Sequence, residues 1–160
     1  MLTTAGAIAL ATKWHDLTEK TDPGSGAPYI SHPIRVMKAV AAAGFDERYQ
    51  RVAVLHDTIE DTDLTVDLLR EAGATEEEIE AVLSVTKPLL DGPYAERVTK
   101  AALNEIGGVV KGFDMLDNSN PERMRLLALV DPKKADRLIP QYAAGLALLE
   151  QLRPGWQHSA

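Results

Sequence analysis

The stretch RVAVLHDTIEDT, residues 51–62, decides how the chain folds. Its apolar residues recur at helical spacing and predict one helical stripe that faces the core. Val52, Leu55, His56 and Ile59 share this stripe. A histidine is therefore expected in the interior, next to the acidic residues that follow it. Buried polar and charged groups need partners, so this stretch is also the first place to look for a functional site.

The rest of the chain repeats the helical spacing, with no sustained strand alternation and no Asn-Gly or Asp-Gly hairpin between β-branched runs. The fold class is therefore predicted to be all-α. At 160 residues and 45% hydrophobic content, one core in a single domain is expected. Residues 1–153 are expected to form a compact helical bundle, and residues 154–160 a frayed C-terminal tail.

Glycine, proline and capping residues set the expected helix boundaries. In chain order, we expect a helix over about 4–19, a loop at 21–28, a helix capped by Ser31 and ended by Gly44, a helix capped by Asp46, a short helix from Thr65 to Gly73, a helix opened by a capping box of Thr75 and Glu78, a helix from near Pro93 to Gly107 and Gly108, a buried helix that breaks at 118–121, and a last helix over about 132–152. The side chains expected to be buried on the last two helices are Val109, Val110, Phe113, Leu116, Leu138, Ile139, Tyr142, Leu146 and Leu149.

Charge and cysteine content exclude several classes of function. The chain has 17 Lys and Arg against 24 Asp and Glu, a formal net charge of -7, which argues against sequence-independent binding of duplex nucleic acid. It has no cysteine, which excludes thiolate zinc sites, iron–sulfur ligation and cysteine nucleophiles. The apolar stretch Ala5–Ala11 is too short to span a bilayer, so we expect no membrane partner and a cytoplasmic protein. The sequence allows a homo-oligomer but does not support one.

Four ionisable residues of the deciding stretch can face one cavity. His56 and Glu60 are one helical turn apart, as are Asp57 and Asp61. Carboxylates this close would raise one another's pKa unless a cation lies among them, and a bound divalent metal ion would meet that need. Two plainer interpretations are a hydrogen-bonded core histidine and a solvated helix end.

Two further polar residues favour the metal site over those interpretations. His32 lies at the start of a helix in PYISHP, and Asp114 lies in the apolar run VVKGFDML. Three helices would then each direct a ligand-type residue inward. Two imidazoles and two carboxylates leave positions of an octahedral shell open for water and a substrate oxygen. The candidate metal ligands are His32, His56, Asp57 and Asp114.

Four motifs, in this order, resemble those of a known family. PYISHP, HDTIEDT, VTK and VKGFDMLDN are similar to the successive motifs of the HD-domain metal-dependent phosphohydrolases, among them the hydrolase module of the RelA/SpoT family and its small stand-alone alarmone hydrolases. The resemblance covers most of the chain and implies a single HD-domain helical bundle. It implies that the four candidate ligands hold a metal ion, usually Mn²⁺, with another divalent cation as the alternative. It also implies that Glu60 and Asp61 orient the attacking water and handle its proton.

The same resemblance implies a nucleotide substrate that is cut at its 3′-pyrophosphate, leaving a nucleoside 5′-di- or triphosphate and pyrophosphate. The basic candidates for binding its phosphates are Lys20, Arg35, Arg97, Lys100 and Lys111, each of which would otherwise be a solvated surface residue. Asn118, one turn after Asp114, matches the asparagine that closes the last motif and is expected to contact the sugar or phosphate. The predicted substrate-binding residues are Lys20, Arg97, Lys111 and Asn118. Tyr29 is expected to pack beneath the metal site.

Two other classes of function stay open. The same metal site could serve an HD-type phosphatase that acts on another nucleotide or a dinucleotide phosphate. A non-catalytic nucleotide-binding module fits less well, because all four ligand positions and both acids are filled. The chain also departs from the alarmone hydrolases between its first helix and PYISHP, where LTEKTDPGSGA carries only Lys20 in place of a basic cluster. The base preference therefore stays open.

Overall fold

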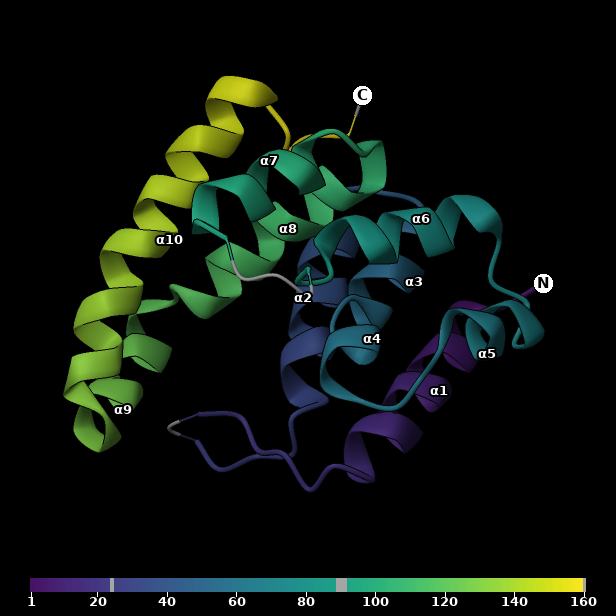
Figure 1. The fold of residues 1–160 in the computed structure, drawn as a ribbon, viewed down its shortest axis with the longest axis horizontal. Coiled ribbons are helices and arrows are strands. Elements are labelled where there is room, and N and C mark those ends of the chain that lie inside the picture. The colour runs from purple at the N-terminus through teal and green to yellow at the C-terminus, as the bar shows by residue number, and fades with distance from the viewer. Residues whose placement is uncertain (24, 89–91, 160) are drawn as a thin grey trace.

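The computed structural model describes residues 1–23, 25–88 and 92–159, and within these residues it contains helices and no strand longer than an isolated bridge (Figure 1). The helices are α1 (Thr4–Asp16), α2 (Ser31–Ala42), α3 (Glu47–Leu55), α4 (Thr58–Asp61), α5 (Val66–Glu71), α6 (Glu76–Val85), α7 (Tyr94–Ala102), α8 (Glu105–Asn118), α9 (Pro121–Val130) and α10 (Pro132–Leu152). The all-α prediction is confirmed.

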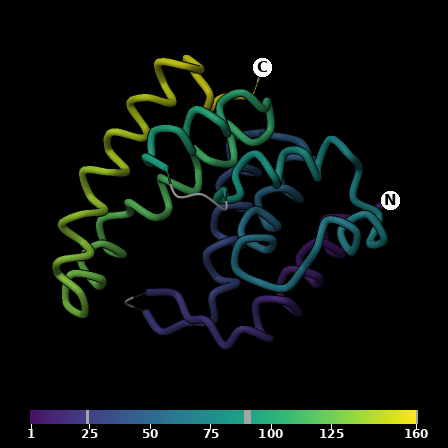
Figure 2. Tube along the Cα trace, viewed as in Figure 1, coloured from purple at the N-terminus to yellow at the C-terminus, as the bar shows by residue number. Residues whose placement is uncertain are grey.

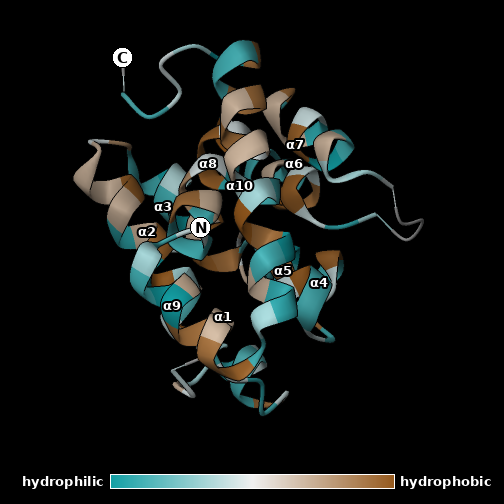
Figure 3. Cartoon of the chain, turned by 90° about the vertical axis from the view of Figure 1, so that its left-hand side faces the viewer, coloured by the Kyte–Doolittle hydropathy of each residue, from teal (hydrophilic) through white to brown (hydrophobic). Residues whose placement is uncertain are grey.

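Helices α2, α3 and α8 form the centre of the bundle. α2 packs on both α3 and α8, while α1 and α6 cover α3, and α6, α7 and α10 cover α8. Figure 2 shows the long α10 along one side, with α9 folded back beside it, and α1 towards the opposite side. Several helices carry brown segments alternating with teal ones in Figure 3, as expected of helices that bury one face. The fully buried Val36, Val52 and Val110 come from the three central helices.

Most of the predicted helix boundaries are confirmed. The Asp46 side chain accepts a hydrogen bond from the Arg48 N–H and caps α3. The capping box of Thr75 and Glu78 opens α6. Gly44 lies just past the end of α2 with φ +87°, a left-handed conformation that an L side chain rarely adopts. These local signals need no tertiary contact, which is why the sequence predicts them well.

The expected cap at Ser31 is wrong. α2 begins at Ser31 itself, and the Ser31 Oγ is buried without a hydrogen-bond partner within the described chain. The first backbone donors of the helix are already taken, because the Ser31 N–H donates to the Pro28 carbonyl and the His32 N–H to the Tyr29 carbonyl. A turn of backbone before the helix therefore replaces the side-chain cap.

The helix expected from Pro93 to Gly107 and Gly108 ends earlier than predicted. α7 stops at Ala102, and the Asn104 side chain accepts from the Gly107 N–H at 2.8 Å to cap α8. The two glycines lie inside α8, where they permit close packing. A Cβ on Gly107 would lie 1.9 Å from Ser84 Oγ, and one on Gly108 would lie 2.8 Å from Arg153 Nη1.

Two side chains predicted to be buried are exposed. Leu116 is 41% exposed and Ile139 is 50% exposed, whereas their neighbours Met115 and Leu138 are buried. Successive residues of a helix turn by about 100°, so one narrow buried face cannot include both members of each pair. The sequence alone does not say which member faces the core.

The helix predicted over residues 51–62 is interrupted. α3 ends at Leu55, α4 begins at Thr58, and His56 and Asp57 lie in the turn between them. The Thr58 hydroxyl donates to the Leu55 carbonyl at 2.6 Å and so satisfies a carbonyl at the end of α3. Apolar spacing stays helical on both sides of the turn, so it carries no signal of the break. The predicted burial of His56 is confirmed, at 3% exposure.

The expected fraying of residues 154–160 is wrong for the part that the structure describes. The Trp156 side chain is 6% exposed and packs edge-on against Phe113, with ring centroids 5.3 Å apart. Gly112 makes room for it, since a Cβ there would lie 2.2 Å from the indole ring. The large apolar area of the indole is buried in the core, and this holds the tail in place. No helix in the described part of the chain has the length and apolar character needed to cross a membrane.

Trp156→Ala is expected to lower the free energy of unfolding by about 3 kcal/mol, because it leaves a cavity beside Phe113. Urea denaturation followed by circular dichroism measures the change. Gln157→Ala, at an exposed neighbouring position, is the matched control and is expected to leave the stability unchanged. Equal stability of the two variants would show that the tail does not pack.

Candidate metal centre and cleft

Three distant parts of the chain bring the predicted ligands together. His32 lies in the first turn of α2, His56 and Asp57 lie in the turn between α3 and α4, and Asp114 lies within α8. Asp114 Oδ1 is 3.1 Å from His32 Nε2 and 3.6 Å from His56 Nε2. Asp57 Oδ2 is 3.0 Å from His56 Nε2 and 3.6 Å from His32 Nε2. The two carboxylate oxygens and the two ring nitrogens therefore converge on one point.

Both imidazoles present the same nitrogen to that point. His56 Nδ1 is 2.7 Å from the Ala53 carbonyl, an acceptor, so Nδ1 must carry the proton. His56 Nε2 is buried and has no hydrogen-bond partner within the described residues. His32 Nδ1 is 2.7 Å from Asp117 Oδ2 and is fixed in the same way. Each Nε2 can thus offer a lone pair, which is the form in which histidine binds a metal ion.

This donor set fits a divalent cation. One atom each from His32, His56 and Asp57 lies within 4.8 Å of the others, and Asp114 adds a second carboxylate. Imidazole nitrogen together with carboxylate oxygen suits borderline and hard divalent ions such as Mn²⁺. An orphaned, fully buried ring nitrogen that faces two carboxylates is otherwise costly to keep in a core.

In the metal-free protein, protons and a lysine offset the buried negative charge. Burial alone would lower the pKa of His56, but the charges of Asp57 and Asp114 raise it well above its ordinary value. Burial would raise the pKa of Asp114, but the Lys111 ammonium, 2.8 Å from Asp114 Oδ2, and the two histidines hold it well below the usual range. A divalent cation at this point would replace the imidazole protons.

Asp117 orients His32 and was not predicted. Its Oδ2 accepts from His32 Nδ1, and its carboxylate also accepts from Arg35 Nε at 2.9 Å and Arg123 Nη1 at 2.7 Å. Burial opposes ionisation of Asp117, but these hydrogen bonds lower its pKa to about 2. The sequence held one signal, since Asp117 lies three residues after Asp114 and so shares its face of the helix.

A second carboxylate, which is buried, completes this network. Asp22, in the loop before α2, is 2% exposed and accepts from Arg35 Nη2 at 2.9 Å and from Arg123 Nη2. Two arginines and two carboxylates thus tie the loop to α2, α8 and α9. Arg35, a candidate phosphate-binding residue, is engaged in this network. Asp22 and Arg123 could not be predicted, because their partners are distant in the sequence.

Tyr29 contacts one of the predicted metal ligands directly. Its ring packs against those of His15 and His32, with centroids 5.1 Å and 5.8 Å away, as expected. Its hydroxyl also donates to Asp57 Oδ2 at 2.6 Å, which the sequence did not predict. This hydrogen bond fixes the orientation of the Asp57 carboxylate.

The two predicted catalytic acids line a cavity of about 280 Å³ together with Asp57 and Asp114. Glu60 Oε2 accepts from the Lys87 N–H at 2.8 Å, and Asp61 Oδ2 lies 2.6 Å from Lys20 Nζ. Burial raises the pKa of Glu60, and the charges of Asp57 and Asp61 raise it further against the opposing effect of the Lys87 N–H. A carboxyl group with a raised pKa is suited to exchanging a proton near neutral pH.

The predicted substrate-binding residues line the same cavity, which includes Lys20, Arg97, Lys111 and Asn118. Two of the lysines are already paired with site carboxylates, Lys20 with Asp61 and Lys111 with Asp114. Asn118 Nδ2 donates to Asp114 Oδ1 at 2.6 Å, so this side chain supports a predicted ligand. Lys100 lies elsewhere, and its ammonium donates to the Leu83 and Thr86 carbonyls at the end of α6.

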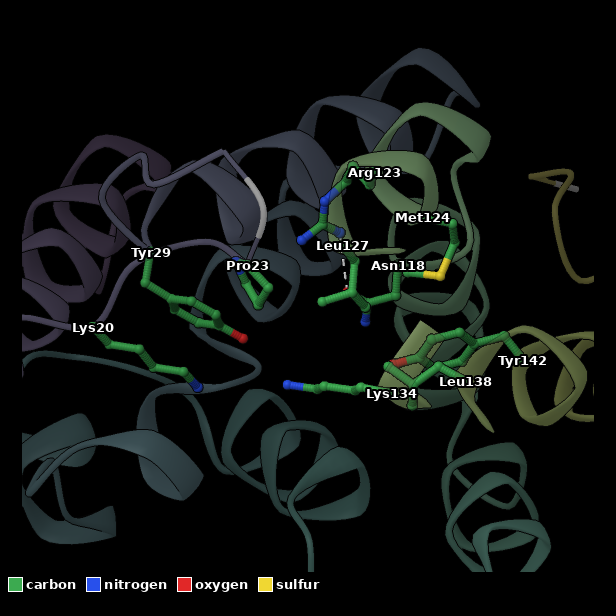
Figure 4. Close-up of a pocket in the computed structure, with 10 residues that line it drawn as sticks. All are labelled: Lys20, Pro23, Tyr29, Asn118, Arg123, Met124, Leu127, Lys134, Leu138 and Tyr142. Atoms are coloured by element: carbon green, nitrogen blue, oxygen red, sulfur yellow. Dashed lines mark hydrogen bonds between the residues drawn. The ribbon is translucent and has the colours of Figure 1, made fainter. Parts of the chain in front are cut away.

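A second cavity, of about 210 Å³, adjoins the first and shares Lys20, Tyr29, Asn118, Leu138 and Tyr142 with it. Figure 4 shows Pro23 and Tyr29 from the loop facing Leu138 and Tyr142 of α10 across this cavity. Met124 and Leu127 of α9 add further apolar surface. The site is therefore one cleft with an acidic, polar end and a less polar end.

Asp117→Asn is expected to raise the dissociation constant for Mn²⁺ by about ten- to a hundredfold, because it removes the charge that orients His32. Isothermal titration calorimetry on the metal-free protein measures this. Asp136→Asn, at an exposed position of α10, is the charge-matched control. Identical affinities of the two variants would contradict the orienting role of Asp117.

Binding of Mn²⁺ at neutral pH is expected to release protons, because the raised pKa of His56 keeps its ring protonated in the metal-free protein while metal ligation requires a neutral ring. Affinity is therefore expected to rise as the pH rises through neutrality. Calorimetric titrations in buffers of different ionisation enthalpy count the protons. Binding with no proton release would show that the ligands are already neutral.

No protein-family model matches the chain. A probable GTP pyrophosphokinase of Mycobacterium leprae (strain TN) is 33% identical over 121 residues, which are 71% of this chain and 15% of that protein. A guanosine-3′,5′-bis(diphosphate) 3′-pyrophosphohydrolase of Danio rerio is 38% identical over 93 residues, 56% of this chain and 49% of that protein. The chain thus spans about half the length of the Danio rerio protein and between 7% and 15% of several longer bacterial relatives.

A solved structure of a metazoan ortholog of SpoT, described as hydrolysing ppGpp, has the same fold. Its TM-score is 0.65 at 22% sequence identity, and the match covers 94% of this chain and 95% of that chain. The predicted HD-domain architecture is therefore confirmed. The resemblance indicated by the four motifs is confirmed as well, because the chain is similar in sequence to guanosine-3′,5′-bis(diphosphate) 3′-pyrophosphohydrolases and has the fold of a SpoT ortholog.

Proposed function

We propose that this chain is a metal-dependent hydrolase that removes the 3′-pyrophosphate of (p)ppGpp-like alarmones, giving GDP or GTP and pyrophosphate. One observation carries the proposal: two imidazole Nε2 atoms and the carboxylates of Asp57 and Asp114 converge in a cleft that two further acids line. The names of the relatives support the substrate, since several are called guanosine-3′,5′-bis(diphosphate) 3′-pyrophosphohydrolases.

The proposed ligands are His32, His56, Asp57 and Asp114, and the proposed ion is Mn²⁺. The bound cation would offset negative charge at phosphorus and lower the pKa of the attacking water. Tyr29 and Asp117 hold a ligand each in the orientation that this requires. Lys111 and Asn118 hold Asp114. Tyr29, Asp117, Lys111 and Asn118 already hold the proposed ligands in the substrate-free protein. This reduces the entropic cost of ordering the site when substrate binds.

The reaction needs one water and moves one proton. The water oxygen attacks the phosphorus attached to the 3′ oxygen, that oxygen–phosphorus bond breaks, and pyrophosphate leaves. The proton lost by the water has to be accepted, and the 3′ oxygen of the product has to gain one. Glu60 is the proposed proton carrier, because its raised pKa lets it hold and return a proton. Asp61, paired with Lys20, is proposed to orient the water.

A product assay tests the function. The purified protein is incubated with Mn²⁺ and ppGpp, and GDP, pyrophosphate and orthophosphate are separated by chromatography, with Asp114→Ala run alongside. The proposal predicts GDP and pyrophosphate from the wild type and no turnover by the variant, which is expected to lose the metal ion. Release of orthophosphate would instead indicate a phosphatase. Tight binding of ppGpp without turnover would indicate a non-catalytic nucleotide-binding module.

Glu60→Gln is expected to lower kcat by ~10²–10⁴-fold, because the amide cannot carry the proton, while the affinity for Mn²⁺ stays close to that of the wild type. Initial rates at saturating ppGpp and a parallel metal titration measure the two quantities. Glu80→Gln, on the exposed face of α6, is the matched control and should keep full activity. A fully active Glu60→Gln enzyme would exclude this residue as the proton carrier.

The remaining expectations stay predictions. They are the cytoplasmic location, the lack of duplex nucleic acid and membrane partners, and the undecided oligomeric state.

A further inference from the structure

We propose that Lys134 and Arg137, in the first two turns of α10, bind the phosphates on the 5′ oxygen of the substrate. This inference rests on the proposed function and assigns the residues that recognise the 5′ end of its substrate. The cleft would select nucleotides that carry anionic groups at both the 3′ and the 5′ oxygen, with the 3′-pyrophosphate at the acidic end and the 5′-phosphates at α10.

Several cations of the cleft are already neutralised by carboxylates. Lys20 pairs with Asp61 at 2.6 Å, and Lys111 pairs with Asp114 at 2.8 Å. Arg123 donates to both Asp22 and Asp117. A substrate phosphate that used Lys111 or Arg123 would have to compete with buried or half-buried carboxylates, and breaking such pairs is costly. Lys20 would have to leave Asp61, although that pair is exposed to solvent.

Lys134 and Arg137 differ from these cations. Lys134 lines the less polar cavity, and Arg137 lines the cavity that contains Asp57, Glu60 and Asp114. Neither side chain forms an ion pair or a side-chain hydrogen bond with any residue that the structure describes. The two residues are three positions apart on α10, so they project from the same face of the helix. Both charges are therefore available to a ligand.

The side chains that follow these cations on α10 suit the apolar part of a nucleotide. Leu138 and Tyr142 lie one and two turns after Lys134 on α10, and both belong to the wall that the two cavities share. Figure 4 shows Lys134 extending from α10 into the cavity, with its Nζ directed towards Lys20 and Tyr29. A ligand with one anionic group among the acidic residues and metal ion can place its apolar part against Leu138 and Tyr142. Its second anionic group then lies near Lys134 and Arg137 of α10.

The charge of the whole protein makes this local arrangement informative. The chain has a formal net charge of -7, which repels a polyanionic nucleotide at long range. A phosphate group that lies far from the proposed metal ion therefore needs positively charged side chains of its own to bind it. Arginine and lysine bind phosphate through charge-assisted hydrogen bonds, which are stronger than those between neutral groups.

The test compares two substrates in one set of variants. One substrate is ppGpp, and the other is guanosine 3′-pyrophosphate with a free 5′ hydroxyl. The double variant Lys134→Gln, Arg137→Gln is expected to lower kcat/KM for ppGpp by about tenfold or more, mainly through KM, because it removes charge-assisted hydrogen bonds. It is expected to leave kcat/KM for the second substrate unchanged. Lys133→Gln, an exposed neighbour that lines neither cavity, is the charge-matched control.

Calorimetric binding of GDP gives a readout that needs no turnover. GDP carries only 5′-phosphates, so the double variant should bind it at least about tenfold more weakly than the wild type or Lys133→Gln. Equal loss of kcat/KM for both substrates, or no loss for ppGpp, would overturn the inference. A wild-type protein that binds GDP through α10 but hydrolyses neither substrate would instead overturn the proposed function, so the two failures are distinguishable.

Discussion

The half-buried Asp57 and the buried Asp114 face two imidazole nitrogens across about 3 Å, and the packing of the helices around them holds them in this arrangement. Such a group of charges is unstable in a core unless protons or a cation balance it. Although burial opposes both shifts, the charges of Asp57 and Asp114 raise the pKa of His56, and Lys111 together with the two histidines lowers the pKa of Asp114. A divalent cation bound among these side chains would replace the imidazole protons. The arrangement therefore fits the proposed metal site.

The helical bundle supplies the rigidity that this site needs. α2, α3 and α8 pack on one another, and each contributes to the centre, α3 through the turn at its end. The break between α3 and α4 places His56 and the next residue, Asp57, in the site together, whereas consecutive residues of a continuous helix point in different directions. Outer contacts then fix the ligands. Tyr29 holds Asp57, and Asp117 holds His32 through a network that reaches the arginines of α2 and α9.

The sequence predicts the centre of the site better than its surroundings, for a physical reason. A polar residue such as Asp114 in an apolar run stands out without any knowledge of the fold. Asp22 and Asp117 do not stand out, because their roles depend on arginines that approach only in the folded chain. In the fold, too, local features are predicted from the sequence and contacts between distant residues are not. Caps such as Asp46 are local and are predicted, whereas the packing of Trp156 onto Gly112 is a tertiary contact that no local pattern indicates.

The most direct test of the account is electron spin echo spectroscopy of Mn²⁺ bound to the purified protein. A metal centre of two imidazoles and two carboxylates predicts one bound ion per chain whose spectrum contains nitrogen couplings from two imidazoles, with one of the two couplings lost in His56→Gln. It also predicts that Tyr29→Phe keeps both couplings but binds the ion more weakly, since Tyr29 holds Asp57 and does not itself ligate. A bound ion without nitrogen couplings, or no stoichiometric binding, would contradict the claim that the two imidazoles and two carboxylates form a metal centre.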